Sequence, residues 1–136
     1  MHMTYKIVEE IADIDTYLRL RKAGDLHQFS RAAAIKGLGG TLVGILVKYN
    51  NEIVGMGRVI GDGGCFFQIV DIVVIKEHRG HGIGKQIVAT LMERLRTSAP
   101  KSAYVSLIAD LPANRLYEQY GFKSIAPQSI GMALSI

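Results

Sequence analysis

Residues 69–96, IVDIVVIKEHRGHGIGKQIVATLMERLR, contain the pattern that decides the fold. The first part, Ile69–Ile75, is nearly all β-branched and apolar, as expected for a strand buried on both faces. A glycine-rich segment, Arg79–Lys85, follows it. Beyond the glycines, large aliphatic side chains recur at helical spacing: Ile83, Ile87, Leu91 and Leu95. The stretch therefore predicts a strand, a tight turn and a helix that begins close to Gly82.

The glycine-rich turn has the properties of a phosphate-binding site. Glycine lets the backbone turn tightly and leaves room for a ligand to reach main-chain amides. The first amides of a helix have no partner within the helix, and they lie at the positive end of its dipole. A turn of this kind is suited to phosphate.

The glycine spacing excludes the two common nucleotide motifs. A Walker-type loop has four residues between its first glycine and the Gly-Lys pair, which a Ser or Thr follows. Here three residues separate Gly80 from Gly84, and Gln86 follows Lys85. A dinucleotide fingerprint requires Gly-x-Gly-x-x-Gly, whereas Gly84 comes one residue too early after Gly82. Without further support, an ordinary strand-to-helix turn would remain an alternative.

Two segments carry a resemblance to a known family. Arg79-x-x-Gly82-x-Gly84, directly after an apolar strand, resembles the acyl-CoA pyrophosphate loop of the GNAT acetyltransferase superfamily. Residues 113–122, ANRLYEQYGF, are similar to its second signature, a short helix that carries Leu-Tyr and ends in Gly-Phe. The two occur in the family's order and at about its separation. The resemblance extends from Glu52 to the C-terminus, and the first fifty residues match only in general layout.

The resemblance implies an α/β fold with a mixed sheet, in which antiparallel N-terminal strands lead to a splayed parallel pair and about four helices flank the sheet. It implies acetyl-CoA as the acyl donor and no metal. The pantetheine arm would pair with the main chain of Ile72, Val73 and Val74, and the N–H of Val73 or Val74 would act as an oxyanion hole. The residues of the turn would hold the cofactor's phosphates: Arg79, Gly80, His81, Gly82, Ile83, Gly84 and Lys85.

Tyr117 is the candidate general acid that the resemblance implies, and it would also contact the cofactor. A phenol with a pKa of about 10 is protonated at neutral pH and can donate a hydrogen bond. The alternative is a core tyrosine whose hydroxyl is satisfied by the protein. Many relatives have Asn seven residues before this Tyr. Here Asp110 holds that position and Asn114 follows four residues later, so either could contact the cofactor.

The general base is open at this stage. Asp71 lies among apolar residues on the central strand, where a buried carboxylate would become more basic. Its alternative is a salt bridge, for which Arg58 on the neighbouring strand is a candidate. Gln68 stands where some relatives carry Glu, and glutamine cannot act as a base. Asp62 is a further possibility.

The bulk properties predict one domain, residues 1–136. Apolar residues make up 49% of the chain and charged residues 21%, as in ordinary globular proteins. The net charge of +4 comes from scattered Lys and Arg with acidic residues among them, so no nucleic-acid partner is expected. No apolar run is long enough for a membrane span, and a single cysteine, Cys65, forms no internal disulfide or metal cluster. We expect a cytoplasmic protein without a membrane partner, with a homodimer possible.

The remaining periodicities and turn residues predict the other elements. The expected helices are Ile14–Ala23, capped by Asp13, Ser30–Ile35, the helix from Gly82 to about Thr97, and a short helix around Tyr117. The expected strands are Thr4–Glu9, Thr41–Lys48, Glu52–Ile60, Cys65–Ile75 and Ala103–Ile108, with Phe122–Ser124 and Met132–Ser135 as a closing pair. The hairpin at Asn50-Asn51 requires a positive φ, which asparagine tolerates.

The sequence therefore predicts an acetyl-CoA-dependent N-acetyltransferase. It would act on the primary amine of a small molecule or amino acid, by direct attack in a ternary complex. The acceptor is expected between Arg21–Gly40 and Arg58–Phe67, with Arg21, Arg58, Asp62 and Phe67 as candidate contacts. Two alternatives remain: a protein or peptide N-acetyltransferase, and a non-catalytic acyl-CoA-binding sensor module.

Overall fold

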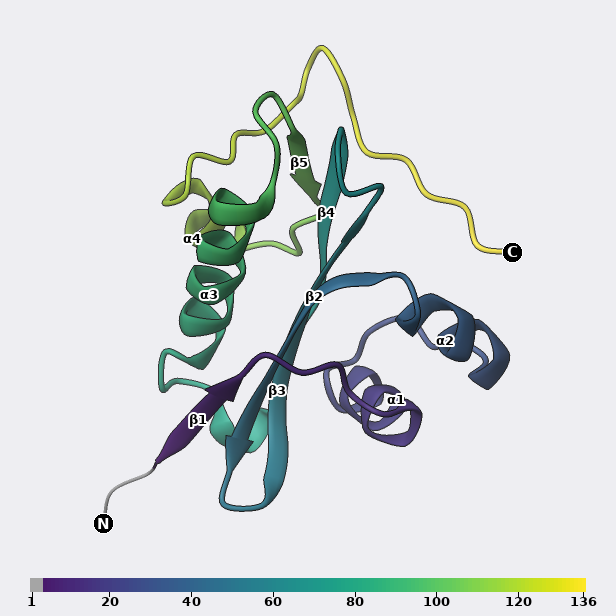
Figure 1. Ribbon diagram of the computed structural model, residues 1–136, viewed down its shortest axis with the longest axis vertical. Coiled ribbons are helices and arrows are strands. Elements are labelled where there is room, and N and C mark those ends of the chain that lie inside the picture. The colour runs from purple at the N-terminus through teal and green to yellow at the C-terminus, as the bar shows by residue number, and fades with distance from the viewer. Residues whose placement is uncertain (1–3) are drawn as a thin grey trace.

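The computed structural model describes residues 4–136, which form a five-stranded sheet with helices on both faces (Figure 1). In chain order the elements are β1 (Tyr5–Val8), α1 (Ile14–Ala23), α2 (Arg31–Leu38), β2 (Thr41–Tyr49), β3 (Glu52–Gly61), β4 (Phe66–Val74), the 3-10 turn η1 (Lys76–His78), α3 (Ile83–Ser98), β5 (Tyr104–Leu107) and α4 (Asn114–Glu118).

The sheet is mixed in direction, as predicted. The strands lie in sequence order, β1 to β5, and the pairs β1–β2, β2–β3 and β3–β4 are antiparallel. The β2–β3 hairpin turns at Asn50, which adopts φ +56°. The long helix α3 connects β4 to β5, and these two strands are parallel.

The two faces of the sheet are covered by different helices. α3 and α4 lie on one side, and α1 and α2 lie on the other (Figure 1). The apolar stripe of α3 is fully buried on the sheet, through Ile83, Ile87, Val88, Leu91, Met92 and Leu95. Burial of one such side chain is worth about 1.5–3 kcal/mol, so this stripe is a main source of stability.

The caps of the first two helices follow the sequence. Asp13 Oδ1 accepts a hydrogen bond from the Thr16 amide (2.8 Å), and Ser30 Oγ accepts one from the Ala33 amide (3.1 Å). α1 has the predicted bounds. α2 continues three residues beyond the predicted end at Ile35, to Leu38, because Gly37 is accommodated in its last turn.

The parallel pair is joined over only part of its length. Four residues of β4 pair with β5, from Phe66 opposite Tyr104 to Ile69 opposite Leu107. Beyond Ile69, β4 continues as Val70–Val74 with β3 on one side and no strand of residues 4–136 on the other. The main chain of this segment is therefore free along one edge.

A β-bulge lies at the start of that free segment. Met56 is opposite Val73 and Arg58 is opposite Val70, so Gly57 alone faces two residues of β4, Asp71 and Ile72. Asp71 has φ +60°, a left-handed conformation that is unusual for a non-glycine residue in a strand. A bulge bends its strand, so β4 turns here, just after its last pair with β5.

The predicted closing pair of strands is wrong. Phe122–Ser124 and Met132–Ser135 form no strand, and the chain after α4 runs past the end of the sheet as an extended tail (Figure 1). The alternation in the sequence identifies strand-like residues, but a strand forms only where an edge is available beside it. Among residues 4–136, no helix is long and apolar enough to cross a membrane.

We expect Gly57→Ala to destabilise the fold, because a Cβ at this position has no room. It would lie 2.6 Å from Ile87 Cγ2, 2.8 Å from Ile72 Cδ1 and 3.0 Å from Leu91 Cδ1. Overpacking of this kind costs about 1–3 kcal/mol. Urea unfolding of both proteins measures the difference in the free energy of unfolding.

Gly37→Ala is the matched control. Gly37 lies in α2, and no atom lies within 4 Å of the position of its Cβ. Alanine is favoured over glycine in a helix by about 0.5–1 kcal/mol, so this variant is expected to be as stable as the parent or more so. Equal stability of the two variants would contradict the tight packing of α3 at the bulge.

Candidate active site

The glycine turn links the end of β4 to the start of α3. After η1, Gly80 and Gly82 adopt φ +84° and +75°, and Gly82 is the N-cap residue of α3. No atom lies within 4 Å of the Cβ position of either glycine, so the space above this turn is open. The left-handed conformation at both positions explains why glycine stands there.

The amides at the start of α3 are available to a ligand. The first hydrogen bond of the helix runs from the Gln86 amide to the Gly82 carbonyl (3.1 Å). The amides of Ile83, Gly84 and Lys85 precede it and have no acceptor within the helix. They lie at the positive end of the helix dipole, which favours an anionic group.

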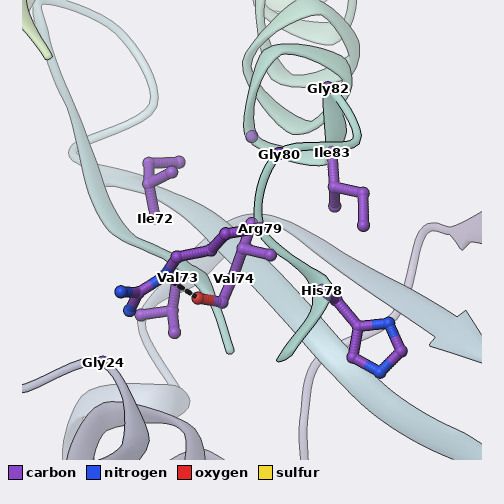
Figure 2. A pocket seen from close by; sticks show the side chains of 10 residues that line it. Gly24, Ile72, Val73, Val74, His78, Arg79, Gly80, Gly82 and Ile83 are labelled. Atoms are coloured by element: carbon purple, nitrogen blue, oxygen red, sulfur yellow. Dashed lines mark hydrogen bonds between the residues drawn. The ribbon is translucent and has the colours of Figure 1, made fainter. Parts of the chain in front are cut away.

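A cavity of about 390 Å³ lies where this turn meets the free edge of β4 (Figure 2). It contains most of the predicted cofactor residues and two that the sequence did not indicate, Gly24 and His78. Its lining is Gly24, Ile72, Val73, Val74, His78, Arg79, Gly80, Gly82, Ile83 and Gly84. The predicted contacts His81 and Lys85 are exposed and do not line it.

The orientation of the β4 main chain follows from its hydrogen bonds. The Ile75 amide donates to the Val54 carbonyl of β3 (3.0 Å), so Ile75 faces β3. Successive residues of a strand direct their main-chain groups to opposite edges, so the N–H and C=O of Val74 face the free edge. Of the two predicted oxyanion donors, the geometry favours Val74 over Val73.

Arg79 is folded back onto this edge. Its Nε donates to the Val74 carbonyl (2.9 Å), as Figure 2 shows. The guanidinium lies beside the free strand edge, on the side of Ile72 and Val73 and away from Gly80 and Gly82 (Figure 2).

His78 anchors the segment that leads into the turn. Its side chain is buried, and its Nδ1 lies 2.9 Å from the hydroxyl of Tyr5 on β1. The ring of Tyr49 packs against it at a centroid distance of 4.9 Å. This contact could not be predicted from local sequence patterns, because His78 and Tyr5 are 73 residues apart.

Asp71 is the centre of a buried ion-pair cluster. Its Oδ1 accepts a hydrogen bond from Arg21 Nη1, and its Oδ2 accepts from Tyr17 Oη (2.9 Å) and Arg58 Nε (2.8 Å). The four side chains come from α1, β3 and β4 and are all buried. Burial, together with the charge of Asp71, raises the pKa of Tyr17, so its hydroxyl stays a donor.

The hydrogen bonds of Asp71 and Asp62 argue against either carboxylate as the general base. The salt bridge from Asp71 to Arg58, the alternative to a catalytic role, is present. With both oxygens engaged by two guanidinium groups and a phenol, the carboxylate is poorly placed to accept a further proton. Asp62 is engaged as well, because its Oδ1 accepts from the amides of Gly64, Cys65 and Phe66 (2.8–3.0 Å). These backbone bonds, with that of Phe66 the largest cause, lower the pKa of Asp62 and weaken it as a base.

Tyr117 borders a second, larger cavity, a groove of about 1100 Å³ between β5, α3 and α4. Its ring is buried and packs edge-on against Phe122, while no hydrogen bond to its hydroxyl is present among residues 4–136. Burial first, and then the charge of Asp110, raise the pKa of Tyr117 above 10.0. The hydroxyl therefore holds its proton at neutral pH. Asn114 also borders this groove, and its side-chain amide donates to Glu118 Oε1 (3.0 Å).

The four candidate acceptor contacts do not gather at one point. Arg21 and Arg58 converge on Asp71, and Phe67 is a core residue. Asp62 closes the turn between β3 and β4. Cys65 is exposed. Within residues 4–136, no three His, Cys, Asp or Glu side chains are grouped as a metal site would require.

Comparison with known proteins gives a consistent result. The chain matches the model of the acetyltransferase (GNAT) family over residues 5–122. It is similar to the crystal structure of a probable acetyltransferase of unknown function from meticillin-resistant Staphylococcus aureus. The two are 39% identical, with a TM-score of 0.92, over 98% of this chain and 100% of that chain.

Two further relatives are more distant. An uncharacterised N-acetyltransferase of Pyropia yezoensis is 29% identical over 73 residues, which are 54% of this chain and 41% of that relative. The chain thus matches less than half the length of this curated relative. A predicted acetyltransferase from Clostridium acetobutylicum, in a crystal structure with acetyl-CoA, is similar in fold. Its TM-score is 0.72 at 16% identity, over 97% of this chain and 96% of that chain.

We expect Asp71→Ala to lower the free energy of unfolding by about 3–5 kcal/mol, because two buried guanidinium groups lose their counter-charge. Chemical denaturation followed by circular dichroism measures this loss. The matched control is Asp15→Ala, which removes an exposed pair between Asp15 and Arg31 (2.7 Å) and should cost less than about 1 kcal/mol. Similar losses in the two variants would contradict a structural role for the buried cluster.

Proposed function

Because this chain belongs to the acetyltransferase (GNAT) family, we propose that it is an N-acetyltransferase that transfers the acetyl group of acetyl-CoA to a small amine. The acceptor class is the primary amine of a small molecule or an amino acid. The reaction proceeds by direct attack in a ternary complex. The family match favours this enzyme over a binding module without catalysis.

One observation carries the proposal: the free edge of β4 and the open glycine turn line the same cavity. Acetyl-CoA consists of a diphosphate joined to an extended arm that carries amide groups. A protein that binds it needs an anion site for the diphosphate and, next to it, main-chain groups of a strand that are free to pair with the arm. The amides of Ile83, Gly84 and Lys85 supply the anion site, and the N–H of Val74, whose carbonyl is held by Arg79, supplies the unpaired strand group. The open space over Gly80 and Gly82 leaves room for the phosphates. The residues present therefore fit this donor.

When bound, acetyl-CoA supplies an acetyl group activated as a thioester. The turn amides hold its diphosphate, and the free edge of β4 orients its arm. We assign the oxyanion donor to the Val74 N–H, which faces that edge. A preorganised donor of this kind is worth about 2.7–4 kcal/mol in comparable acyl transfers.

Tyr117 is the proposed general acid. Its hydroxyl is protonated at neutral pH, has no partner among residues 4–136 and borders an open groove. A proton held at this oxygen can be given to a leaving thiolate. Asp110, which acts on the pKa of Tyr117, helps to keep that proton in place.

In this proposal Asp71 positions the site and is not the base. Its carboxylate keeps β4 in the bulged conformation that leads into the free edge. Arg21 and Arg58 each carry a positive charge, and the Asp71 carboxylate neutralises only one of the two. The cluster therefore carries a net positive charge. The acceptor is placed on the side of α1 and α2, near this cluster.

Gly82→Val is expected to abolish coenzyme A binding, because a β-branched side chain is strained at φ +75° and would occupy the open space over the turn. Calorimetric titration with coenzyme A measures the affinity. Gly63→Val is the matched control, since Gly63 has φ +79° and the same open surroundings but lies in the β3–β4 turn. Normal affinity in Gly82→Val would contradict the phosphate assignment.

Tyr117→Phe is expected to lower turnover by more than about tenfold, with coenzyme A affinity nearly unchanged, because only the proton donor is removed. The assay is thiol release from acetyl-CoA with a panel of amines, amino acids and short peptides. Tyr120→Phe, three residues further along, serves as the control and should retain activity. Unchanged turnover in Tyr117→Phe would exclude Tyr117 as the acid. Activity on peptides alone would contradict the small-amine proposal.

A further inference from the structure

The buried cluster at Asp71 contains more positive than negative charge. Arg21 and Arg58 both pair with this one carboxylate, and neither forms an ion pair with another acidic side chain among residues 4–136. Arg21 is only 7% exposed and Arg58 only 9%, so water solvates neither charge fully. A positive charge in such surroundings is costly unless an anion accompanies it. The cluster therefore has the charge to accept one further anionic group.

Arg21 is fully engaged within the protein. Its Nε and Nη2 both donate to the carbonyl of His27, and its Nη1 donates to Asp71 Oδ1. The ring of Phe29 covers one side of the guanidinium, with its centroid 4.3 Å from Cζ. Every nitrogen of this group thus has an acceptor. Arg21 ties the loop between α1 and α2 to β4, and it has no nitrogen left for a ligand.

Arg58 differs from Arg21 in having one uncommitted nitrogen. Its Nε donates to Asp71 Oδ2 (2.8 Å), and its Nη1 donates to Thr41 Oγ1 (2.6 Å) and to the Gly37 carbonyl (3.3 Å). Its Nη2 has no acceptor among residues 4–136. In the same part of the chain, no fully buried side-chain nitrogen or oxygen lacks a hydrogen bond, so Nη2 reaches the surface. Arg58 therefore presents two N–H groups at the edge of a buried, positively charged cluster.

This nitrogen lies within reach of the proposed acyl-donor site. Asp71, to which Arg58 is bound, precedes Val74 by three residues, and three residues of a strand span no more than about 10 Å. On the other side, Gly24 lines the cavity and follows Arg21 by three residues. A small acceptor could therefore place its amine at the free edge of β4 and a second polar group at Arg58.

We propose that the acceptor amine also carries an anionic oxygen group, a carboxylate or a phosphate, which Arg58 Nη2 binds. The inference rests on the proposed function, because it names the class of acceptor for that same site. Guanidinium N–H groups form strong, charge-assisted hydrogen bonds with both anions. The group brings the second negative charge, which Asp71 alone does not supply. Diamines and polyamines are poor acceptors on this basis, because their second charge is positive and the cluster repels it.

The test compares acceptors in matched pairs that differ in the anionic group alone. Glycine, γ-aminobutyrate and free lysine are each assayed against their carboxamides, and phosphoethanolamine against ethanolamine, by thiol release from acetyl-CoA. The anionic member of the preferred pair is expected to have a kcat/KM at least about tenfold higher, the effect of one hydrogen bond to a charged group. The difference should lie in KM, because the contact is remote from the reacting atoms. The preferred pair distinguishes carboxylate from phosphate.

The outcomes separate this inference from the proposed function. Turnover without a preference in any pair overturns the inference and leaves the N-acetyltransferase proposal standing. Absence of thiol release with every amine contradicts the proposed function. In that case calorimetric titration of the protein with the same pairs decides the inference, and equal or absent binding of the two members overturns it.

Arg58→Lys tests the assignment to this side chain. Lysine keeps a positive charge for Asp71 but has a single nitrogen, so no N–H group remains at the position of Nη2. The ratio of kcat/KM between the two members of a pair is expected to fall towards one. This ratio does not change with a general loss of activity, and circular dichroism checks the fold. The control Arg31→Lys alters an exposed arginine of α2, which pairs with Asp15, and should keep the preference of the parent. A preference that persists in Arg58→Lys overturns the assignment, and the comparison in the parent chain needs no variant.

Discussion

The arrangement of the site depends on one constraint: Asp71 is held in a left-handed conformation in the middle of a strand. Its carboxylate is fixed by Arg21 and Tyr17 from α1 and by Arg58 from β3. Burial of these charges costs desolvation energy, so the cluster is not explained by stability alone. It does tie α1, β3 and β4 together at the residue where β4 bulges, so we interpret it as the device that holds a strained backbone in place.

The bulge and the glycines around it act together. Because β4 bends at Asp71, its continuation leaves β5 and presents the Val74 main chain to the cavity. Gly57 faces the bulge and lets Ile87 and Leu91 of α3 approach the sheet, while a Cβ at Gly24 would lie 2.9 Å from Val73 Cγ1. Packing on both faces of the sheet thus fixes the free edge of β4, which adjoins the glycine turn. The cavity at the free edge of β4 is thus a consequence of the close packing at Gly57 and Gly24.

Signals within a few residues of each other predicted most of the fold and the turn. The caps at Asp13 and Ser30, the spacing of the glycines and the periodicity of α3 are local, so the sequence displays them. The cluster at Asp71 was predicted only in part, as a possible pair with Arg58. The contribution of Arg21 and Tyr17, 50 and 54 residues away, depends on how α1 packs across the sheet. No spacing in the sequence encodes that distance, and the same holds for Tyr5 and His78.

The C-terminal residues show a different limit of the sequence. Alternation of large and small side chains from Ile130 to Ile136 specifies a strand, because the period of a strand is two. It does not specify the edge that the strand joins. Met132–Ser135 therefore has the residues of a strand, yet it forms none among residues 4–136.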